Sequence, residues 1–166
     1  MSKYESLHLK NQLSFALYQA SHAINAKIRP YLKNFGLTYP QYFVLCVLWE
    51  SDTSQTVKAI SDKLSLDSGT LTPLLKRMEN AGFVVRKRSK KDERVVNISL
   101  TPASQAIQGE LAEMHIEATA EVSSLAGFSV AKSAELIDTL HRLSETLEFT
   151  ELERENEAEA HLSIVV

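Results

Sequence analysis

The hydrophobic pattern of this chain changes its period at Gly82, and that change restricts the fold more than any other feature. Over residues 68–80 the apolar residues recur three and four positions apart, which is typical of an amphipathic helix; Asp67 is a suitable N-cap. Beyond Gly82, the β-branched residues within 83–85 and 95–100 flank a polar turn. The pattern therefore predicts a helix followed directly by a β-hairpin, whose tip is Ser89-Lys90-Lys91-Asp92.

Pro73 conflicts with a helix that begins at Ser68, because in the second turn it forfeits one backbone hydrogen bond and crowds the preceding turn. Local rules alone favour a start at Thr72, with Pro73 at the first helical position. The longer helix, bent at Pro73, is preferred here because of the family resemblance described below.

Other helices surround this pair of elements. Those before it are expected at 13–28, interrupted by Arg29-Pro30 and Gly36; at 40–49, after Thr38 as N-cap; and at 57–64. A long helix is expected from Thr101-Pro102 to Gly127, and a last one along the leucine stripe from Leu136 to Leu147. The predicted fold is mainly α with a small β-hairpin, which is the arrangement of a winged helix-turn-helix.

Charge is strongly segregated along the chain, although the net charge of 166 residues is only -3. The segment Lys76–Arg94 holds eight basic and three acidic residues, a net charge of +5, so the remainder carries -8. Much of that negative charge lies beyond Leu143. Segregation of this kind indicates an anionic partner for the middle of the chain.

DNA is the anionic partner that the residue types favour. Hydroxyl groups at the start of a recognition helix meet base edges and phosphates, cations further along meet phosphates, and an arginine on a narrow ribbon can enter the minor groove. The alternative, solvated charges on an exposed hairpin, is disfavoured by the charge segregation. The predicted DNA-binding residues are Ser68, Gly69, Thr70, Thr72, Pro73, Lys76 and Arg77 in the helix, and Arg86, Arg88, Lys90, Lys91, Asp92 and Arg94 in the wing, where Asp92 braces Arg94.

Several classes of protein are excluded by what the sequence lacks. The five histidines show no ligand spacing, so no metal is expected, and no phosphate-binding loop or catalytic motif indicates a cofactor or an enzyme. No signal peptide or membrane span is visible, and the single cysteine fits a reducing cytoplasm. Two alternative functions are a thiol peroxidase that uses Cys46, which the apolar neighbours of Cys46 and the absence of a base disfavour, and a winged helix that binds protein.

The segments Asp67–Glu79, Gly82-Phe83-Val84, Arg86–Ser89 and Asp92-Glu93-Arg94 resemble the MarR family of bacterial repressors. Asn11–Tyr18 and Leu37–Tyr42 are similar to the OhrR branch of organic-hydroperoxide sensors. The resemblance implies a homodimer, joined by N- and C-terminal helices, on a palindromic operator. It also implies one protomer over residues 1–149, with a DNA-binding lobe at 38–101 and dimerisation helices at 5–35 and 102–149. The Glu- and Ala-rich composition of residues 150–166 predicts a partly disordered acidic tail.

Ser14 departs from that branch, in which a peroxidatic cysteine occupies this position. A serine hydroxyl forms no sulfenic acid, so the first step of peroxide sensing is chemically absent. The resemblance places Tyr18, Tyr39 and Tyr42 in the same sensor pocket, whereas a further expected tyrosine is Ile28. Two explanations stay open: a near-isosteric replacement that fixes the reduced form, or a relative that has lost thiol sensing.

Two consequences follow for the effector. A repressor that is released by a small phenolic or fatty ligand in the pocket is the alternative to peroxide sensing. Cys46 could be a substitute sensor, but its apolar neighbours favour a small buried side chain with a raised pKa.

Overall fold

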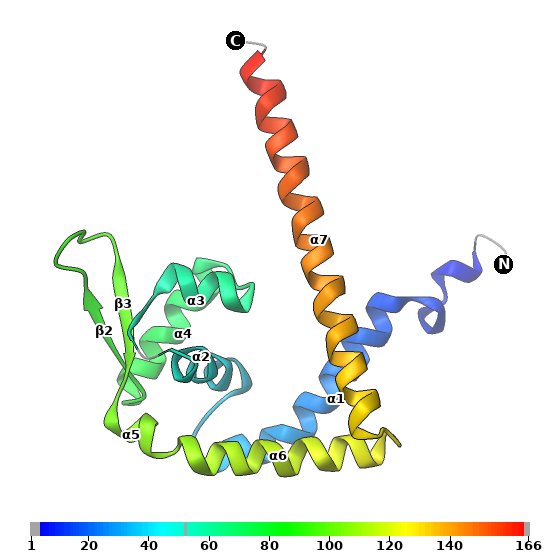
Figure 1. Cartoon of the computed structure of the whole chain (residues 1–166), viewed down its shortest axis with the longest axis horizontal. Helices are drawn as coiled ribbons and strands as arrows, with labels where there is room; N and C mark the ends of the chain where they lie inside the picture. Colours follow the sequence, from blue (N-terminus) through cyan, green and yellow to red (C-terminus); the bar gives the residue numbers. More distant parts are fainter. Residues whose placement is uncertain (1–3, 52, 165–166) are drawn as a thin grey trace. The chain divides into compact units, whose positions relative to one another are not determined.

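The computed structural model describes the backbone of residues 4–51 and 53–164, and the side chains of 4–51 and 53–147 (Figure 1). The chain divides into two compact units, Met1–Ala118 and Thr119–Val166. The elements, in chain order, are η1 Glu5–Leu7, η2 Leu9–Asn11, α1 Leu13–Asn34, α2 Tyr39–Trp49, β1 Gln55–Thr56, α3 Val57–Leu64, α4 Ser68–Asn80, β2 Val84–Arg88, β3 Val96–Leu100, α5 Pro102–Ala106, α6 Gln108–Leu125 and α7 Val130–Ile164. The predicted mainly α fold with a β-hairpin is confirmed.

Helix α1 continues through Pro30, where the sequence predicted an interruption. Pro30 removes one backbone hydrogen bond, but Ile28 and Leu32 on either side are buried in the core, 4% and 0% exposed. Their burial holds the last turns in place. The helix ends at Asn34, and Gly36 just beyond it has a φ of 69°, the left-handed conformation that glycine adopts freely.

The next three helices begin at the caps that the sequence provides. Thr38 precedes α2, and its N–H donates to Gln41 Oε1 at 2.8 Å in a capping box. Thr56 caps α3 by accepting from the N–H of Ala59 at 3.0 Å. Helix α4 begins at Ser68 and contains Pro73, so the longer of the two predicted helices is confirmed.

The sheet has three antiparallel strands in the order β1-β3-β2. Strands β2 and β3 form the predicted hairpin, with Val84 opposite Leu100 and Arg86 opposite Ile98. Strand β1, which pairs Gln55 with Ile98, was not predicted because two residues carry no detectable alternation.

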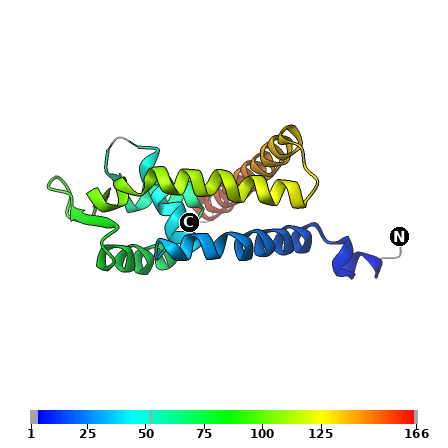
Figure 2. The same ribbon diagram turned by 90° about the horizontal axis from the view of Figure 1, so that it is seen from below.

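The core of the first unit surrounds α2, which is apolar on nearly every side. Val44 and Leu45 are fully buried, and helices α3 and α4 and strand β3 pack against α2. Helices α1 and α6 each contribute one buried stripe to the same cluster. Figures 1 and 2 show that the N-terminal half of α1 extends away from α2, α3, α4 and the hairpin.

The predicted helix from Thr101 is broken in two, with α5 ending at Ala106 and α6 starting at Gln108. Ser104 is fully buried and fixes α5 beneath the hairpin, while Gly109 lowers the helix propensity just past the break. Gly127, with a φ of 66°, ends α6 as predicted.

The second unit contains the end of α6 and helix α7. The hydroxyl groups of Ser123 and Ser133 lie 3.1 Å apart, and Lys132 Nζ lies 5.0 Å from the Phe128 ring centre. The backbone of α7 remains helical to Ile164, and thus includes most of the segment for which the sequence predicted a partly disordered tail. Glutamate and alanine, which dominate that segment, are good helix formers. No helix in the described part of the chain is long and apolar enough to span a membrane.

Candidate nucleic-acid interface

Helix α4 buries one face and exposes the other. Leu71, Leu75 and Met78 are fully buried against α2, α3 and β2. Of the predicted DNA-binding residues in this helix, Thr72 is half-buried and the others are exposed, namely Ser68, Gly69, Thr70, Pro73, Lys76 and Arg77. The predicted hydroxyl and cationic side chains therefore share the face that the core leaves free.

Asp67 fixes the first turn of α4. Its carboxylate accepts from the N–H of Thr70 at 2.9 Å and from the Thr70 hydroxyl at 2.7 Å. These hydrogen bonds, the side-chain one first, lower the pKa of Asp67 below its usual value. A Cβ at Gly69 would lie 2.9 Å from the carboxylate, so glycine leaves room for the cap.

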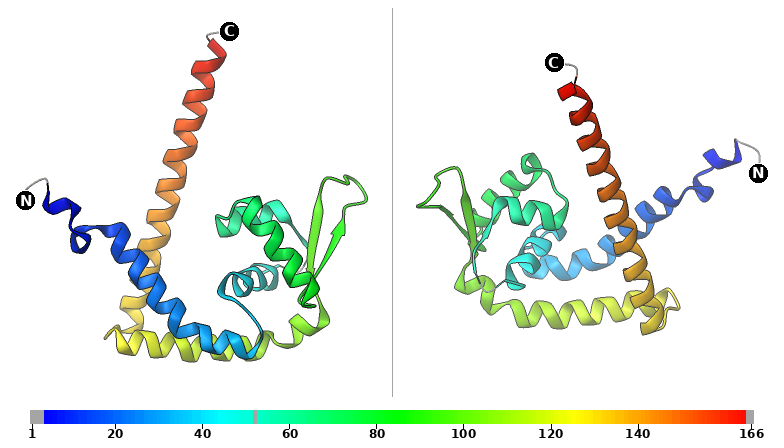
Figure 3. Two further views of the ribbon diagram at one scale, coloured as in Figure 1. Left: turned by 180° about the vertical axis from the view of Figure 1, so that it is seen from behind. Right: turned by 45° about the horizontal axis from the view of Figure 1, so that its top comes forward.

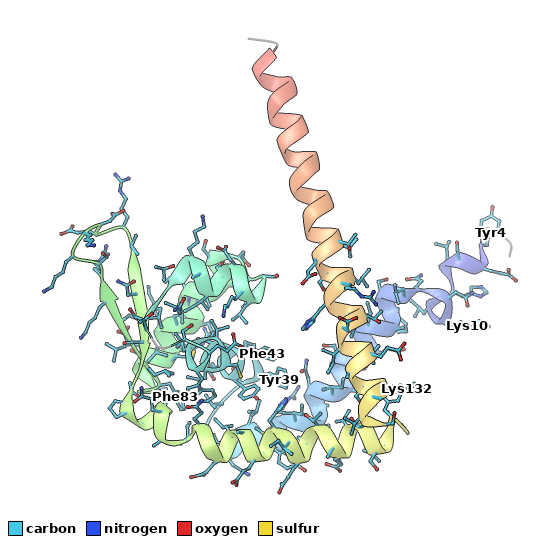
Figure 4. The ribbon with its side chains drawn as sticks, viewed as in Figure 1. Tyr4, Lys10, Tyr39, Phe43, Phe83 and Lys132 are labelled. Carbon is cyan, nitrogen blue, oxygen red and sulfur yellow. The ribbon has the colours of Figure 1, made fainter. Side chains whose placement is uncertain are left out.

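The wing tip is ordered by hydrogen bonds among its own residues. Ser89 N–H donates to the Val95 carbonyl at 2.8 Å, and the Ser89 hydroxyl accepts from the Lys91 N–H at 3.2 Å. Asp92 accepts from the backbone N–H of Arg94 at 3.0 Å, so its brace acts on the backbone of Arg94. Lys90, Lys91 and Arg94 are exposed. Figure 3 shows the hairpin projecting past α3 and α4, and nitrogen-bearing side chains extend from its tip in Figure 4.

The side chains of the two remaining wing arginines, Arg88 and Arg86, each contact an acceptor within the protein. Arg88 is exposed, and its Nη1 donates to the Glu93 carbonyl at 2.7 Å across the hairpin. Arg86 is half-buried, and its Nη1 lies 3.4 Å from Glu79 Oε2 of α4. The predicted alternation of both arginines onto one face is confirmed by their register opposite Val96 and Ile98, but it is the face that carries buried Ile98. Arg86 is therefore engaged within the protein.

The base of the wing is fixed by two residues, Thr101 and Ser104, that were not among the predicted site residues. The Thr101 hydroxyl donates to the Gly82 carbonyl at 2.8 Å, and the buried Ser104 hydroxyl donates to the Phe83 carbonyl at 2.7 Å. Both contacts join residues about 20 positions apart, so no local pattern reveals them. The only sequence indication is the Thr-Pro helix start.

The predicted sensor residues do not form one pocket within the chain. Ser14 and Tyr18 are exposed on α1, where Tyr18 stacks with His22 at 6.2 Å between ring centres. Tyr39 lines the same cavity as Asn25 of α1, and Asn25 is eleven residues, or about 16 Å of helix, from Ser14. The four residues are thus separated into two pairs.

Tyr39 and Tyr42 belong instead to an aromatic cluster on α2. Tyr39 meets Phe43 edge to face at 4.6 Å (Figure 4), and Tyr42 stacks with His115 of α6 at 6.2 Å. The thiol of Cys46 hydrogen-bonds with Tyr42, and burial raises the pKa of both groups. A thiol with a raised pKa has little thiolate, which agrees with the predicted structural role of Cys46.

A cavity of about 410 Å³ lies where the last turns of α1 meet the start of α2. Its lining is mostly apolar and includes two cations, Arg29 and Lys33. The other lining residues are Asn25, Leu32, Leu37, Thr38, Tyr39 and Pro40. Within the described residues, no group of three or more acidic, histidine or cysteine side chains is placed to hold a metal ion.

The fold and the site define a winged-helix DNA-binding protein. Its parts are the short helix α3, the recognition helix α4 with an exposed cationic face, and the wing formed by β2 and β3. Residues 26–111 match the family described as transcriptional regulator SarA/Rot. The chain is also 41% identical over 146 residues to the organic hydroperoxide resistance transcriptional regulator of Bacillus subtilis (strain 168), covering 88% of this chain and 96% of that protein.

Solved structures agree with this result. Reduced AbfR bound to DNA has a TM-score of 0.73 and 36% identity, covering 90% of this chain and 98% of that one. AbfR, from Staphylococcus epidermidis, has also been solved in an overoxidised form bound to DNA and in a disulfide form. A MarR transcriptional regulator from Methanosarcina mazei Go1 shares the fold, with a TM-score of 0.70 at 20% identity, covering 81% of this chain and 94% of that one.

The chain belongs to the SarA/Rot family of transcriptional regulators and has the winged-helix fold of MarR-type proteins. It is a DNA-binding regulator and not an enzyme, as its relatives and structural neighbours are regulators.

Proposed function

We propose that this chain is a cytoplasmic, homodimeric repressor of an organic-peroxide or oxidative-stress response, which binds a palindromic operator through α4 and the wing. The observation that carries this proposal is the exposed face of α4, where hydroxyl groups at the helix start are followed by Lys76 and Arg77. The exposed cations of the wing tip lie on the adjoining hairpin. Together they supply contacts for bases and phosphates on a chain that is otherwise acidic.

Exposed apolar side chains on α1 support the homodimer. Leu13 and Tyr18 are 65% and 66% exposed, although both belong to the apolar stripe or aromatic row of that helix. A second copy of the chain would cover such side chains. The separation of Ser14 from Tyr39 within one chain is a further reason for a second copy, because a sensor pocket that contains both needs residues from two chains.

The peroxide response is proposed from the relatives. The similar Bacillus subtilis protein is named for organic hydroperoxide resistance, and AbfR has been solved in reduced and oxidised forms. In this chain Ser14 occupies the sensor position, so the chain would hold the DNA-binding form when peroxide is present.

The test measures binding of a labelled palindromic operator by fluorescence anisotropy, with and without cumene hydroperoxide, for the wild type and for Ser14→Cys. We expect operator binding by both, release by peroxide only for Ser14→Cys, and a dimer mass by light scattering. Ser14→Ala is the matched control, since it adds no thiol. Release of the wild type by peroxide would contradict the role of Ser14, and no preference for the palindrome over a scrambled duplex would contradict the repressor itself.

The cavity beside Arg29 favours a second candidate, a repressor released by a small phenolic or fatty ligand. A mostly apolar lining that includes two cations suits an aromatic or aliphatic carboxylate. Salicylate and decanoate are suitable probes in the same anisotropy assay. Release that is lost in Arg29→Gln would support this candidate, and unchanged binding with both probes would exclude these two classes of ligand.

A further inference from the structure

Glu79, in the last turn of α4, holds a single residue of the wing by two contacts. Its Oε1 accepts from the backbone N–H of Arg86 at 3.3 Å, and its Oε2 lies 3.4 Å from Arg86 Nη1. The Glu79 carboxylate therefore contacts both the backbone and the side chain of Arg86. The recognition helix and the wing are joined at this point by charge as well as by the chain.

The guanidinium group of Arg86 is poorly placed to contact DNA. The side chain is 20% exposed, and its Nε atom is buried without a hydrogen-bond partner among the described atoms. In the sheet register Arg86 lies opposite Ile98, which is fully buried. To reach a phosphate, this side chain would have to leave both the core-facing side of the sheet and its acidic partner.

We infer that Glu79 and Arg86 are positioning residues, which set the angle of the wing relative to the recognition helix, and that Arg86 is not a phosphate contact. The inference rests on the proposed operator binding. It separates Arg86 from the other wing cations, which are exposed, and assigns a role to Glu79, an acidic side chain beside a surface that binds a polyanion.

Because the hairpin is long, a small rotation at Arg86 produces a large displacement of the wing tip. Arg86 lies in the middle of β2, and the tip residue Lys90 lies four residues further along. At ~3.4 Å per residue the tip is about 14 Å away, so a rotation of about 10° at Arg86 would displace it by about 2 Å. A shift of that size takes the tip cations out of hydrogen-bonding distance of their phosphates.

The Glu79→Gln variant gives the decisive experiment, because the two interpretations of Glu79 predict opposite changes in the affinity for the operator. If Glu79 were only a charge near DNA, its neutralisation would strengthen binding to every duplex. As a positioning residue, its loss weakens binding to the palindromic operator, by at least about threefold for a coupling of this kind, while binding to a scrambled duplex stays the same or improves. Tighter or unchanged operator binding by Glu79→Gln would overturn the inference.

A double-mutant cycle with Arg86→Gln completes the test. We expect Arg86→Gln to weaken operator binding without changing its salt dependence, and the double variant to be no weaker than the worse single variant. Lys87→Gln, on the opposite, exposed face of the same strand, is the matched control for the loss of one positive charge. A salt slope lowered by about one in Arg86→Gln would show a phosphate contact instead.

Two further measurements keep the result interpretable. Thermal unfolding of each variant shows whether the lobe stays folded, and Arg86→Lys, which keeps the charge, should recover most of the operator preference. If Arg86→Gln unfolds, the direction in which Glu79→Gln changes operator affinity still distinguishes a positioning role from a simple charge effect. A wild type that does not prefer the palindrome would contradict the proposed function, whereas a wild type that prefers it and variants that bind as it does would contradict only this inference.

Discussion

The carboxylate of Asp67 accepts both the backbone N–H and the side-chain hydroxyl of Thr70, at 2.9 Å and 2.7 Å. This pair sets the first turn of the recognition helix and holds the exposed Thr70 hydroxyl against the Asp67 carboxylate. Asp67→Ala should lower the unfolding temperature and weaken operator binding, because the N–H of Thr70 loses its side-chain acceptor and keeps only the Asp67 carbonyl at 3.2 Å. Asp67→Asn should keep most of both properties, as asparagine is also a good N-cap. Equal losses in the two variants would contradict the capping role.

Gly69→Ala should disturb the same cap from its other side. The added Cβ would lie 2.9 Å from Asp67 Oδ1, so the carboxylate has to move away from Thr70. We expect weaker operator binding than for the wild type, measured by anisotropy, and no further loss when Asp67→Ala is added. Additive losses from the two changes would contradict a shared cause.

Replacement by alanine should change the free energy of unfolding in opposite directions at two glycines, Gly82 and Gly109. Gly82 has a φ of 79° just past α4, so Gly82→Ala should lower the free energy of unfolding by about 1 kcal/mol through backbone strain alone. Gly109 has no atom within 4 Å of an added Cβ and lies in helix α6, so Gly109→Ala should raise it by up to about 1 kcal/mol. Urea denaturation measures both; a destabilised Gly109→Ala would contradict the prediction.

Arg94→Ala should weaken operator binding and reduce the slope of log affinity against log salt by about one, because an exposed wing cation releases a counterion from the DNA. Lys10→Ala is the control, since Lys10 lies in η2, far from the wing within the first unit (Figure 4). An unchanged slope for Arg94→Ala would remove Arg94 from the phosphate contacts.

Cys46 should be unreactive at neutral pH in the folded protein. Burial raises the pKa of its thiol above the ordinary value of about 8.5, so the folded chain keeps the proton that the unfolded chain loses. The stability that this thiol contributes is present below about pH 8.5 and is lost as the pH rises toward the folded pKa. Iodoacetamide followed by mass spectrometry should label Cys46 quickly in urea and slowly in buffer. Stoichiometric oxidation of Cys46 by a low concentration of peroxide would contradict this interpretation.

The order of the helices and the hairpin could be predicted because each carries a local pattern. Asp67 and Gly82 mark the limits of α4, and the change of period at Gly82 marks the hairpin. The continuation of α1 through Pro30 could not be predicted, because it depends on the burial of side chains by distant parts of the chain. The same is true of the break before α6.

The sequence identified the residue types of the candidate site, but it did not distinguish exposed cations from an arginine that contacts another part of the protein. Lys76, Arg77 and Arg94 are exposed, as a DNA contact requires. Arg86 looks identical to them in the sequence, and its partner Glu79 is a helix residue seven positions away. The alternation of valine and arginine in β2 places Arg86 on the same face as Val84, and this was the only indication that it is partly covered.

The hydrogen bond between Glu79 and the backbone of β2 has a consequence for solubility. Strand β2 is the edge of the sheet, and an uncovered edge is a template on which strands of other molecules can pair and aggregate. Glu79 occupies the N–H of Arg86 at that edge, and Lys87 and Arg88 add exposed positive charge beside it. One occupied N–H and the adjacent positive charges therefore disfavour pairing of this edge with another β-strand, while the tip of the wing stays exposed.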